Sequence, residues 1–516
     1  MKLGIDFGTT RIVVAAVDRG NYPLVPFETT EGIYDWFPSL AAVRTSIDGS
    51  EYRFGWDAWD VQNESGWTAV RSLKRYIDDA GPSSVVAVGG RHVPLADLLA
   101  GLTQSLHQTL STQYGEKLEV MLGVPAHANS NQRFLTVDAF RRAGFEVLGL
   151  INEPSAAAIE YGHRQKTKGK ILVYDLGGGT FDVSLVNVEG GQHTVLASDG
   201  ISNLGGDDFD HVLAELAMAG ISTGGDEGEG LYGLQLAEYF HLLEECRRQK
   251  EALHPNSRRI VVDLDSAREG LGQVTVNVAD FYEQCRPLLA ASLEATMRLA
   301  EGQNIDTFYV TGGGSELPLV ARVLRDEFGR KVKRSEYTRS ATAIGLAIHA
   351  DDSSGYKLRE MFTRNFGVWR ETDGGQRLVF DPIFPYGTRL PAAGAPPETV
   401  TRRYYPVHNI GHFRYLEANH VGESQQPEGD IALWDEIQFP FDPSLSAMET
   451  LAETAVAHSP AAESQEIEEH YACDAAGGVT VTIRNLTSHY SREYRLGRWS
   501  PKTEVIRPVA RRKKKQ

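Results

Sequence analysis

Two short turns combine glycine, threonine and aspartate at matching positions of two apolar hairpins. Residues 174–182 read YDLGGGTFD, and apolar runs typical of β-strands lie on both sides. The N-terminal stretch LGIDFGTTRIVVAAV places an aspartate before a Gly-Thr-Thr turn in the same way. Glycines allow close approach of the backbone, and successive amide N–H groups in a tight turn form a site for an anion such as phosphate.

Aspartates accompany both turns, at Asp6, Asp175 and Asp182. These carboxylates would repel a bound phosphate unless a cation lies between them. Mg²⁺, which binds carboxylate, phosphate and water oxygens, fits this arrangement. For 174–182 alone, a glycine-rich hairpin with solvated carboxylates is an equal alternative. The repetition favours a nucleotide phosphate site with magnesium and suggests an ancient duplication.

A third glycine loop, GGGS at 312–315, follows an apolar strand and precedes a helix with Leu317, Val320 and Leu324 on one face. Such a strand–glycine–helix junction suits close approach of a nucleoside or phosphate. The sequence has no Walker A, G-x-G-x-x-G, H-E-x-x-H or G-x-S-x-G motif. Phosphate binding would therefore use the paired hairpins.

The elements that must position these turns alternate between strands and helices over residues 1–348, which predicts an α/β architecture. Helices are predicted at 130–144, from Pro154 onward and at 234–253. From 367 to about 495 the pattern changes to short strands separated by Pro, Gly and Asp, which predicts an all-β module. The stretch 443–466, rich in Ala, Ser, Glu and Pro, is predicted to be a flexible loop.

Composition limits the function classes. With 516 residues, two or more domains are expected, and a net charge of −17 argues against a nucleic-acid groove. The basic end, ARRKKKQ, is interpreted as a solvated tail. Cys246, Cys285 and Cys473 lack metal or disulfide spacing, which suits a reducing cytoplasm. We expect no targeting segment and no membrane span.

The motifs GIDFGTT, GVPA…QR, INEPSAAAIEYG, DLGGGTFDVSL, LGGDDFD and TGGGSELPLV occur in the order found in one family. In this respect the chain resembles the seventy-kilodalton heat-shock (DnaK-type) chaperones. The resemblance implies an actin-like (ribonuclease-H-like, duplicated) α/β ATPase domain at 1–348 and a linker at 349–365. It further implies a smaller all-β sandwich at 366–506, followed by the basic tail at 507–516. The family's helical lid is expected to be missing, as in a short lidless variant.

The resemblance also implies roles for matching residues. Lys74 would lie beside the γ-phosphate and Glu153 would orient the attacking water, with Asp175 and Thr180 completing the catalytic set. Asp6, Asp175 and Asp182 would hold Mg²⁺ mostly through water. The expected nucleotide contacts are Gly8, Thr9, Thr10, Gly177, Gly178, Gly179, Gly205, Gly206, Lys250, Gly312, Gly313 and Gly314. Pro125 and Arg133 match the family's interdomain relay.

Simpler interpretations of these residues stay open. Lys74 could be a solvated helix lysine, Glu153 a helix-end carboxylate and Thr180 a turn hydrogen-bond donor. Pro125 could merely end a strand, and Arg133 could lie on the surface.

Some positions depart from the family. The adenosine-contacting helix of the family carries an acidic residue, lysine, arginine and serine, and only Lys250 agrees here. Arg247, Glu251 and His254 stand at the other three positions. In the third loop, Gly314 and Glu316 replace serine and the arginine that lies near adenine. These changes imply an altered nucleotide affinity and base preference.

The linker and the absent lid have their own implications. The linker offers Tyr356, Leu358, Met361 and Phe362 in place of the family's run of leucines. Coupling between the domains is therefore expected to differ. Without a lid, peptide release is expected to be fast.

We interpret the chain as an ATP-dependent chaperone that binds ATP or ADP with Mg²⁺ and hydrolyses ATP slowly. Its expected partners are unfolded or extended apolar polypeptide segments, a J-domain-type co-chaperone and a nucleotide exchange factor, with no nucleic acid and no membrane. One alternative is a nucleotide-dependent regulator or scaffold that docks one dedicated protein. A sugar kinase or filament-forming protein on the same fold is a second alternative.

Overall fold

The computed structural model describes residues 1–46, 49–77, 80, 84–88, 91–166, 168–219, 234, 236–372, 377–391, 395–448, 450–474 and 477–496. The chain forms two compact units. The first comprises Met1–Ala128 and Leu135–Leu358, and the second comprises Asn129–Phe134 with the described residues from Arg359 onward. The basic tail that the sequence predicts at 507–516 lies outside the described residues.

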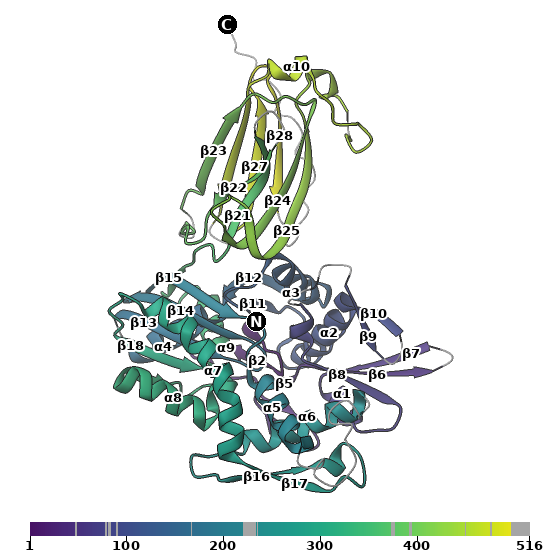
Figure 1. Ribbon diagram of the computed structural model, residues 1–516, viewed down its shortest axis with the longest axis vertical. Helices are drawn as coiled ribbons and strands as arrows, with labels where there is room; N and C mark the ends of the chain where they lie inside the picture. The colour runs from purple at the N-terminus through teal and green to yellow at the C-terminus, as the bar shows by residue number, and fades with distance from the viewer. Residues whose placement is uncertain are drawn as a thin grey trace. The chain divides into compact units, whose positions relative to one another are not determined.

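The first unit contains a five-stranded sheet built on the N-terminal hairpin, with the strand order β12-β11-β1-β2-β5 (Figure 1). β1 and β2 are antiparallel, whereas β1 with β11 and β11 with β12 are parallel. Its strands are β1 Lys2–Phe7, β2 Arg11–Ala16, β5 Phe37–Pro38, β11 Glu119–Val124 and β12 Glu146–Asn152. Continuous apolar runs form these strands because both faces of the sheet are covered.

A six-stranded sheet in the same unit is built on the second glycine hairpin, in the order β19-β18-β13-β14-β15-β20. β13 and β14 are antiparallel, and β18 and β19 add to β13 in parallel. Its strands are β13 Gly169–Leu176, β14 Phe181–Glu189, β15 Gln192–Ile201, β18 Thr307–Thr311, β19 Val332–Arg334 and β20 Lys357–Arg359. Apart from β20, the order of strands along the chain and across the sheet is the same as in the first sheet.

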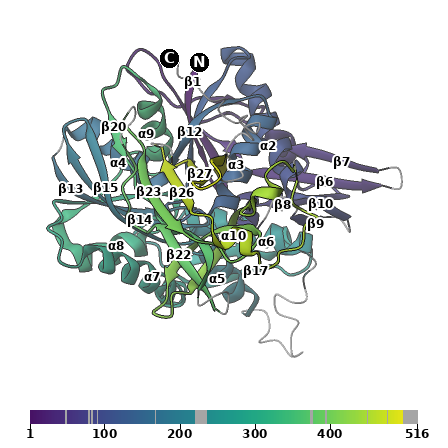
Figure 2. The same ribbon diagram turned by 90° about the horizontal axis from the view of Figure 1, so that it is seen from above.

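Two helices, α4 (Glu153–Gln165) and α9 (Ala341–Ala350), cross at very short range between these sheets (Figure 2). A Cβ at Gly345 of α9 would lie 1.8 Å from the carbonyl oxygen of Ala156 in α4. A Cβ at Gly4 of β1 would lie 2.2 Å from the backbone nitrogen of Ala347 in α9. Glycine is therefore required where β1 meets α9 and where α9 meets α4.

The remaining elements of the first unit are helices and several small sheets. A large core joins the second sheet to α5, α6, α7 and α8, with Phe209, Leu242, Phe281 and Leu319 fully buried. The helices are α1 Trp56–Val61, α2 Leu95–Tyr114, α5 Gly206–Ala219, α6 Leu236–Glu251, α7 Val278–Ala300, α8 Pro318–Phe328 and α3 Ser130–Arg142, whose residues up to Phe134 belong to the second unit. The short strands are β3 Phe27–Glu28, β4 Ile33–Tyr34, β6 Leu40–Ser46, β7 Gly49–Phe54, β8 Trp67–Arg71, β9 Val85–Val88, β10 Arg91–Pro94, β16 Arg259–Asp263 and β17 Gln273–Asn277.

Single-turn 3₁₀ helices complete the first unit. They are η1 Leu73–Ile77, η4 Leu264–Ser266, η5 Gly313–Glu316 and η6 Gly329–Lys331. Within the described ranges, no helix has the length and hydrophobicity needed to cross a lipid bilayer.

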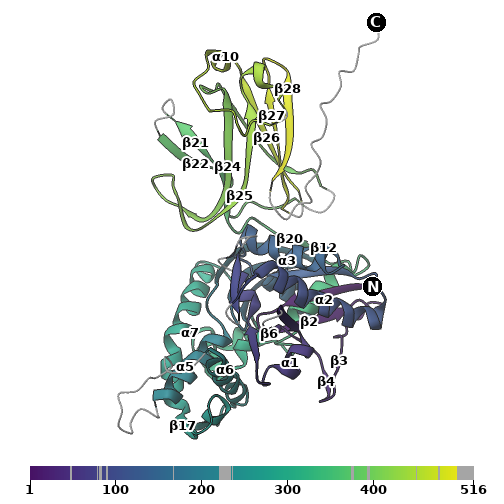
Figure 3. The same cartoon turned by 90° about the vertical axis from the view of Figure 1, so that its right-hand side faces the viewer.

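The second unit is a sandwich of two four-stranded antiparallel sheets, in the orders β22-β21-β24-β25 and β23-β26-β27-β28 (Figure 3). Phe366, Tyr415, Phe439 and Tyr471 form the centre of its core. The strands are β21 Asn365–Thr372, β22 Arg377–Phe384, β23 Glu398–Tyr404, β24 Ile410–Val421, β25 Pro427–Pro440, β26 Ile467–Cys473, β27 Val479–Asn485 and β28 Tyr490–Leu496. The all-β character predicted for this region is thus present.

The stretch 443–466 corrects one prediction, because it is not simply a flexible loop. It contains the 3₁₀ helix η8 (Pro443–Leu445) and the short helix α10 (Pro460–Glu463). The Ser459 hydroxyl accepts a hydrogen bond from the Ala462 amide, and Leu451 and Ala462 are buried. Capping and burial of small side chains order a segment whose composition alone indicates disorder.

The three cysteines are free and buried. Burial raises the pKa of the Cys285 and Cys473 thiols to about 12, and it also raises that of Cys246. Thiolates, the reactive form, are therefore scarce at neutral pH.

A buried histidine makes the first unit acid-sensitive. His193 in β15 packs on α4, where a Cβ at Gly162 would lie 2.6 Å from its Nε2. Burial lowers the pKa of His193 to about 4, although the Gly191 and Ala158 carbonyls act in the opposite direction. The folded chain thus binds this proton less readily than the unfolded chain. The resulting stability is complete above pH 6.5 and is lost as the pH falls toward 4.

We therefore expect His193 to reduce the free energy of unfolding by about 2 kcal/mol between pH 7 and pH 5. The measurement is thermal or urea unfolding of the full chain at both pH values. His193→Gln should flatten this part of the pH dependence, whereas His254→Gln, at an exposed histidine, should leave it unchanged. Equal pH profiles for wild type and His193→Gln would contradict this assignment.

Candidate functional site

The two glycine–threonine turns lie against each other in the first unit. A Cβ at Gly178 would lie 2.5 Å from Oγ1 of Thr10, and one at Gly179 would lie 2.6 Å from Oγ1 of Thr9. The Gly177 amide donates to the Thr180 carbonyl at 2.9 Å and closes the second turn. Two turns 170 residues apart in the sequence are thus brought together, as the motif pattern predicts.

Two further glycine segments pack on the second turn. The Gly206 amide donates to the Gly177 carbonyl at 2.9 Å, and a Cβ at Gly205 would lie 2.5 Å from the Gly178 carbonyl oxygen. A Cβ at Gly314 would lie 2.6 Å from the Gly177 carbonyl oxygen. These glycines therefore allow three loops to approach backbone to backbone.

The loops enclose a cavity of about 120 Å³. Most of the residues expected at a nucleotide site line it: Asp6, Gly8, Thr9, Thr10, Lys74, Glu153, Asp175, Gly177, Gly178, Thr180, Gly206, Lys250, Gly312, Gly313 and Gly314. Gly179, Gly205 and Asp182 are not in the lining. Gly179 and Gly205 instead pack loop against loop, and Asp182 is a buried residue of β14 that accepts a hydrogen bond from the Ala126 amide.

Asp175 and Asp182 are directly opposite each other in the β13–β14 hairpin. Both are buried, and like charges at opposite positions of a ladder destabilise it. Asp182 accepts hydrogen bonds from the Ala126 amide at 2.8 Å and lies 3.1 Å from Nδ1 of His127. The pKa of Asp175 is raised well above its ordinary value by burial and by the Glu153, Asp182 and Asp6 carboxylates. Acidic groups are thus gathered at this part of the cavity, and their burial and mutual repulsion favour the protonated form of Asp175.

One cation, Lys74, faces this cluster. Its Nζ donates to Oε1 of Glu153 at 2.5 Å. Burial acts against the Lys74 ammonium, but the Glu153 and Asp6 carboxylates raise its pKa overall. Burial raises the pKa of Glu153 to about 7, against the opposing effect of Lys74, and it also raises the pKa of Asp6. The pair combines a charged ammonium with a carboxyl that can exchange a proton near neutral pH.

The structure bears on the simpler interpretations of these two residues. Lys74 is only 8% exposed and lies in η1, so the solvated-lysine alternative is wrong. Glu153 is the first residue of α4, where the N-terminal amides stabilise a negative charge, and it also reaches the cavity. The two alternatives for Glu153 are therefore compatible.

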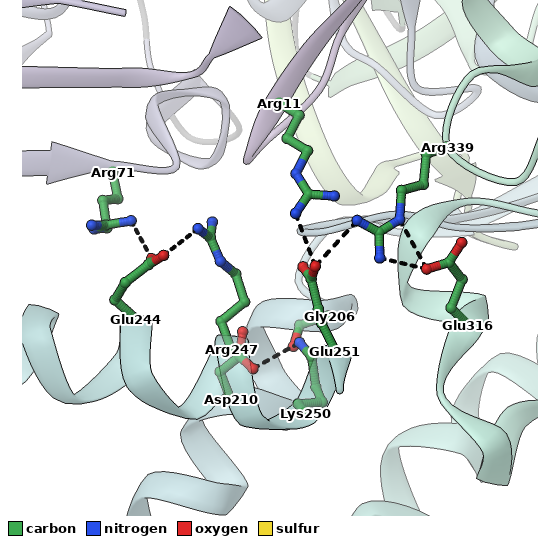
Figure 4. Close-up of polar contacts among 10 residues, drawn as sticks. All are labelled: Arg11, Arg71, Gly206, Asp210, Glu244, Arg247, Lys250, Glu251, Glu316 and Arg339. Atoms are coloured by element: carbon green, nitrogen blue, oxygen red, sulfur yellow. Dashed lines mark hydrogen bonds and ion pairs between the residues drawn. The ribbon is translucent and has the colours of Figure 1, made fainter. Parts of the chain in front are cut away.

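The end of the cavity lined by Arg11, Glu251 and Arg339 is crossed by ion pairs (Figure 4). Arg11 of β2 donates to Glu251 of α6 at 2.8 Å, and Arg339 donates to the same carboxylate at 3.1 Å. Arg339 also donates through Nε to Glu316 at 2.8 Å. The two carboxylates that depart from the family pattern are therefore both paired with arginines from other segments.

Next to this chain of ion pairs, α6 holds a second group of contacts. Lys250 donates to the Gly206 carbonyl at 2.5 Å and pairs with Asp210 at 2.7 Å (Figure 4). Arg247 and Arg71 both donate to Glu244. Although burial acts in the opposite direction, these arginines hold the pKa of Glu244 below its ordinary value.

We expect Arg339 and Glu316 to stabilise the fold as a pair. Arg339→Glu should lower the melting temperature, and adding Glu316→Arg should recover most of the loss. The expected coupling energy is about 1 kcal/mol, because both side chains are partly exposed. It should decrease at about 1 M salt, since screening weakens exposed pairs. Strictly additive losses in the double variant would contradict the pairing.

Sequence reasoning missed several lining residues: Arg11, Val13, Asp207, Thr338, Arg339 and Thr342. Arg11 follows the first turn directly, so its place next to the motif could have indicated that it lines the cavity. No local pattern marks Arg339, whose contact with Glu316 spans 23 residues. Of the proposed relay residues, Pro125 follows β11 and Arg133 lies in α3, and neither lines the cavity.

The arrangement suits a phosphorylated ligand bound together with a cation. Amide-rich turns offer donors to phosphate, Lys74 adds a positive charge, and the nearby carboxylates suit a bound cation. Among the described residues, no group of three His, Cys, Asp or Glu side chains is close enough to bind a metal directly. The first unit is therefore an α/β structure with two mixed sheets. The glycine turns of these sheets meet at a cavity that suits a phosphate group.

Comparisons with known proteins identify the family. A family model described as Hsp70 protein matches residues 60–365, more than half of the chain, so the chain belongs to the Hsp70 family. It is 32% identical over 431 residues to "Chaperone protein HscA homolog" of Laribacter hongkongensis and 31% identical over 430 residues to that of Pseudomonas fluorescens. Each alignment covers 77% of this chain and 65% of the relative. The chain thus spans about two-thirds of the length of these relatives.

Proposed function

We propose that the chain is an ATP-dependent chaperone that binds ATP with Mg²⁺ in the glycine-lined cavity and hydrolyses it slowly. Nucleotide state would then control how the second unit binds extended polypeptide segments. One observation carries this proposal: two glycine–threonine turns meet around a buried Lys74–Glu153 pair. The relatives named as chaperones support it.

The fold is proposed to be the actin-like, duplicated type. This proposal is supported by the strand order that the two sheets of the first unit have in common. In each sheet, two parallel strands are added in the same order to a hairpin with a glycine turn. A duplicated plan provides two equivalent turns that can hold the phosphates from opposite sides.

The residues divide the work of phosphoryl transfer. Amides of the Gly8–Thr10 and Gly177–Thr180 turns would hold the β- and γ-phosphates, and the Lys74 ammonium would stabilise charge on the γ-phosphate. The Glu153 carboxyl, with its pKa raised to about 7, would orient the attacking water and accept a proton from it. The Thr180 hydroxyl would fix that water or a γ-phosphate oxygen.

The cavity fits a divalent cation. Asp175 and Asp182 are buried directly opposite each other, and Asp6 and Glu153 add further acidic groups near one lysine. Asp6, Asp175 and Asp182 would hold Mg²⁺ mostly through water, consistent with the preference of this ion for retained waters. When bound, Mg²⁺ would neutralise phosphate charge.

The proposal also covers signalling between the domains, the regulating proteins, the domain boundaries and the cellular compartment. Pro125 and Arg133 would relay nucleotide state, and a J-domain-type co-chaperone and an exchange factor would regulate the cycle. The proposed domain boundaries are 1–348, 349–365 and 366–506. Three free, buried thiols suit a reducing compartment such as the cytoplasm.

A second candidate is a scaffold with weak or no ATPase activity. The observation that favours it is the Arg11–Glu251–Arg339 bridge at the end of the cavity where the nucleoside would lie. A nucleoside would have to share or displace these contacts. In that case the β sandwich would dock one dedicated protein.

The test is calorimetric titration of ATP–Mg²⁺ and ADP into the full chain, with phosphate release followed in parallel. We expect binding with slow release, and a release rate at least about tenfold lower for Thr180→Ala. Thr275→Ala, at an exposed threonine of β17, is the matched control and should behave as wild type. Absence of nucleotide binding would favour the scaffold.

A further inference from the structure

A histidine and a serine that do not line the cavity hold one of the acidic residues next to it. The turn after β11 carries His127, whose Nδ1 lies 3.1 Å from Oδ1 of Asp182 in β14. On the other side of the imidazole ring, Oγ of Ser202 lies 2.8 Å from Nε2. The Ala126 amide of the same turn donates to the same Asp182 oxygen at 2.8 Å. We call the connected side chains of Asp182, His127 and Ser202 the His127 bridge.

The roles of the two ring nitrogens follow from their partners. An aspartate oxygen that already accepts the Ala126 amide accepts again from the ring, so Nδ1 of His127 carries a hydrogen atom. In a neutral imidazole, Nε2 is then an acceptor, and the Ser202 hydroxyl is its donor. Ser202 therefore selects the tautomer that His127 needs in order to donate to Asp182.

The backbone leaves room for the imidazole ring. Gly200 of β15 is directly opposite Asp182 in the β14–β15 ladder. A Cβ at Gly200 would lie 2.4 Å from Nδ1 of His127 and 3.1 Å from Oδ1 of Asp182. A larger residue at this position would therefore displace the ring from the carboxylate. The side chains of His127 and Asp182 are 17% and 2% exposed, so the imidazole takes a place that bulk water does not reach freely.

Asp182 acts on the cavity although it does not line it. It is paired with Asp175, which is part of the lining, in the β13–β14 hairpin. Burial raises the pKa of Asp175 and of Glu153, and the Asp182 carboxylate raises both further. Its Oδ1 accepts two hydrogen bonds, whereas its Oδ2 has no hydrogen-bond partner among the described residues. The His127 bridge thus fixes one oxygen of a carboxylate that lies within electrostatic reach of the cavity.

The His127 bridge also joins the two large sheets of the first unit. His127 follows β11 of the five-stranded sheet, whereas Asp182 and Ser202 lie in β14 and directly after β15 of the six-stranded sheet. The two contacts of the ring span 55 and 75 residues of sequence. Because the glycine turns of the same two sheets meet at the cavity, the bridge ties the orientation of Asp182 to their packing.

We propose that His127 and Ser202 are positioning residues for ATP hydrolysis. The Ser202 hydroxyl fixes the tautomer of His127, and His127 orients the Asp182 carboxylate for the Mg²⁺–nucleotide complex. This inference rests on the proposed function, because it deepens the role given there to Asp182. Residues that hydrogen-bond a metal-site carboxylate change metal affinity or activity by about 10- to 100-fold when they are replaced.

The first test measures how much Mg²⁺ tightens ADP binding. ADP is titrated calorimetrically into the full chain with Mg²⁺ and, separately, with EDTA. His127→Phe keeps a ring but removes both nitrogens, and we expect it to reduce this effect of Mg²⁺ by about tenfold or more. His127→Asn places an amide N–H near the position of Nδ1, so it should recover most of the effect. His92→Phe, at an exposed histidine of β10, is the control and should behave as wild type.

Ser202 is tested by phosphate release and by NMR. Ser202→Ala should slow phosphate release at saturating ATP–Mg²⁺ by about tenfold, whereas Ser202→Thr, which keeps the hydroxyl, should stay close to wild type. NMR of the nucleotide-free chain with ¹⁵N-labelled histidine reports the tautomer itself. The His127 signal, identified by its loss in His127→Asn, should show the hydrogen on Nδ1 in wild type and a mixture of tautomers in Ser202→Ala.

The outcomes separate this inference from the proposed function. A wild-type effect of Mg²⁺ in folded His127→Phe, or an equal loss in His127→Asn, would overturn the inference while nucleotide binding stands. A hydrogen on Nε2 in the wild-type chain would overturn it as well. If His127→Phe does not fold, wild-type phosphate release by Ser202→Ala overturns it. Absence of ADP binding by the wild-type chain would overturn the inference and the proposed function together.

Discussion

Replacing Lys74 by Met is expected to lower the rate of phosphate release by about 10²- to 10³-fold. The side chain is buried, and its ammonium is the positive charge that faces Glu153 and Asp6. Without it, charge that develops on the γ-phosphate would lose its fixed partner. The measurement is single-turnover phosphate release from the full chain at saturating ATP–Mg²⁺.

Two further variants separate chemistry from folding. Lys74→Met leaves Glu153 buried without a partner, which destabilises the fold by itself. Lys74→Met with Glu153→Gln removes that unpaired charge, so it should recover stability while release stays slow. Lys333→Met, at an exposed position of β19, should match wild type in both measurements. Wild-type release by the folded double variant would refute the proposed roles of both residues.

Replacing Gly345 by Ala is expected to destabilise the first unit by about 3 kcal/mol. The new Cβ would lie 1.8 Å from the Ala156 carbonyl oxygen and 2.5 Å from its carbon, and neither backbone atom can rotate away. Helices α4 and α9 would have to separate. The expected fall in melting temperature is about 4 °C for a unit of this size.

The control is Gly149→Ala in β12, where the nearest atom to a new Cβ is the flexible Met121 sulfur at 3.4 Å. Its melting temperature should change little. Because Glu153 begins α4, Gly345→Ala should also disturb the cavity and weaken ATP binding. An unchanged melting temperature would contradict this prediction, because it would mean that α4 and α9 can separate without a loss of stability.

The hairpins and glycine loops were predictable because their signals are local. Gly177–Gly179 lies between two apolar runs, and each flank carries an aspartate, so strand, turn and strand follow from residue types alone. The repeated pattern at Gly8–Thr10 predicted that two such turns would share a site. The helix starting at Ser130 and the one starting at Glu153 were predictable from local start signals.

The charge partners of Glu251 and Glu316 could not be predicted in the same way. Glu251 meets Arg11 across 240 residues and Arg339 across 88 residues. Pairs of this kind depend on how sheets and helices pack, and side-chain type alone does not select one arginine among many. A single sequence therefore identified Glu251 and Glu316 as departures without revealing what compensates them.

Strand pairing in the β sandwich could not be predicted in full from the sequence either. Alternating short strands predicted the module, but nothing in residues 365–372 indicates that pairing with β24 stops at Val368. Strand separation depends on the twist and on both neighbours, β22 and β25. The order in 443–466 was also missed, because capping by Ser459 and burial of Ala462 are properties of the folded chain.

The buried thiols have a practical consequence for spectroscopy. Cys246, Cys285 and Cys473 are buried, and their raised pKa values leave almost no thiolate for maleimide chemistry at neutral pH. Cysteines introduced at exposed positions, one in each unit, would thus take up a donor and an acceptor dye without removal of the native residues. Single-molecule energy transfer on the otherwise natural chain could then follow the distance between the units as ATP, ADP and peptide are exchanged.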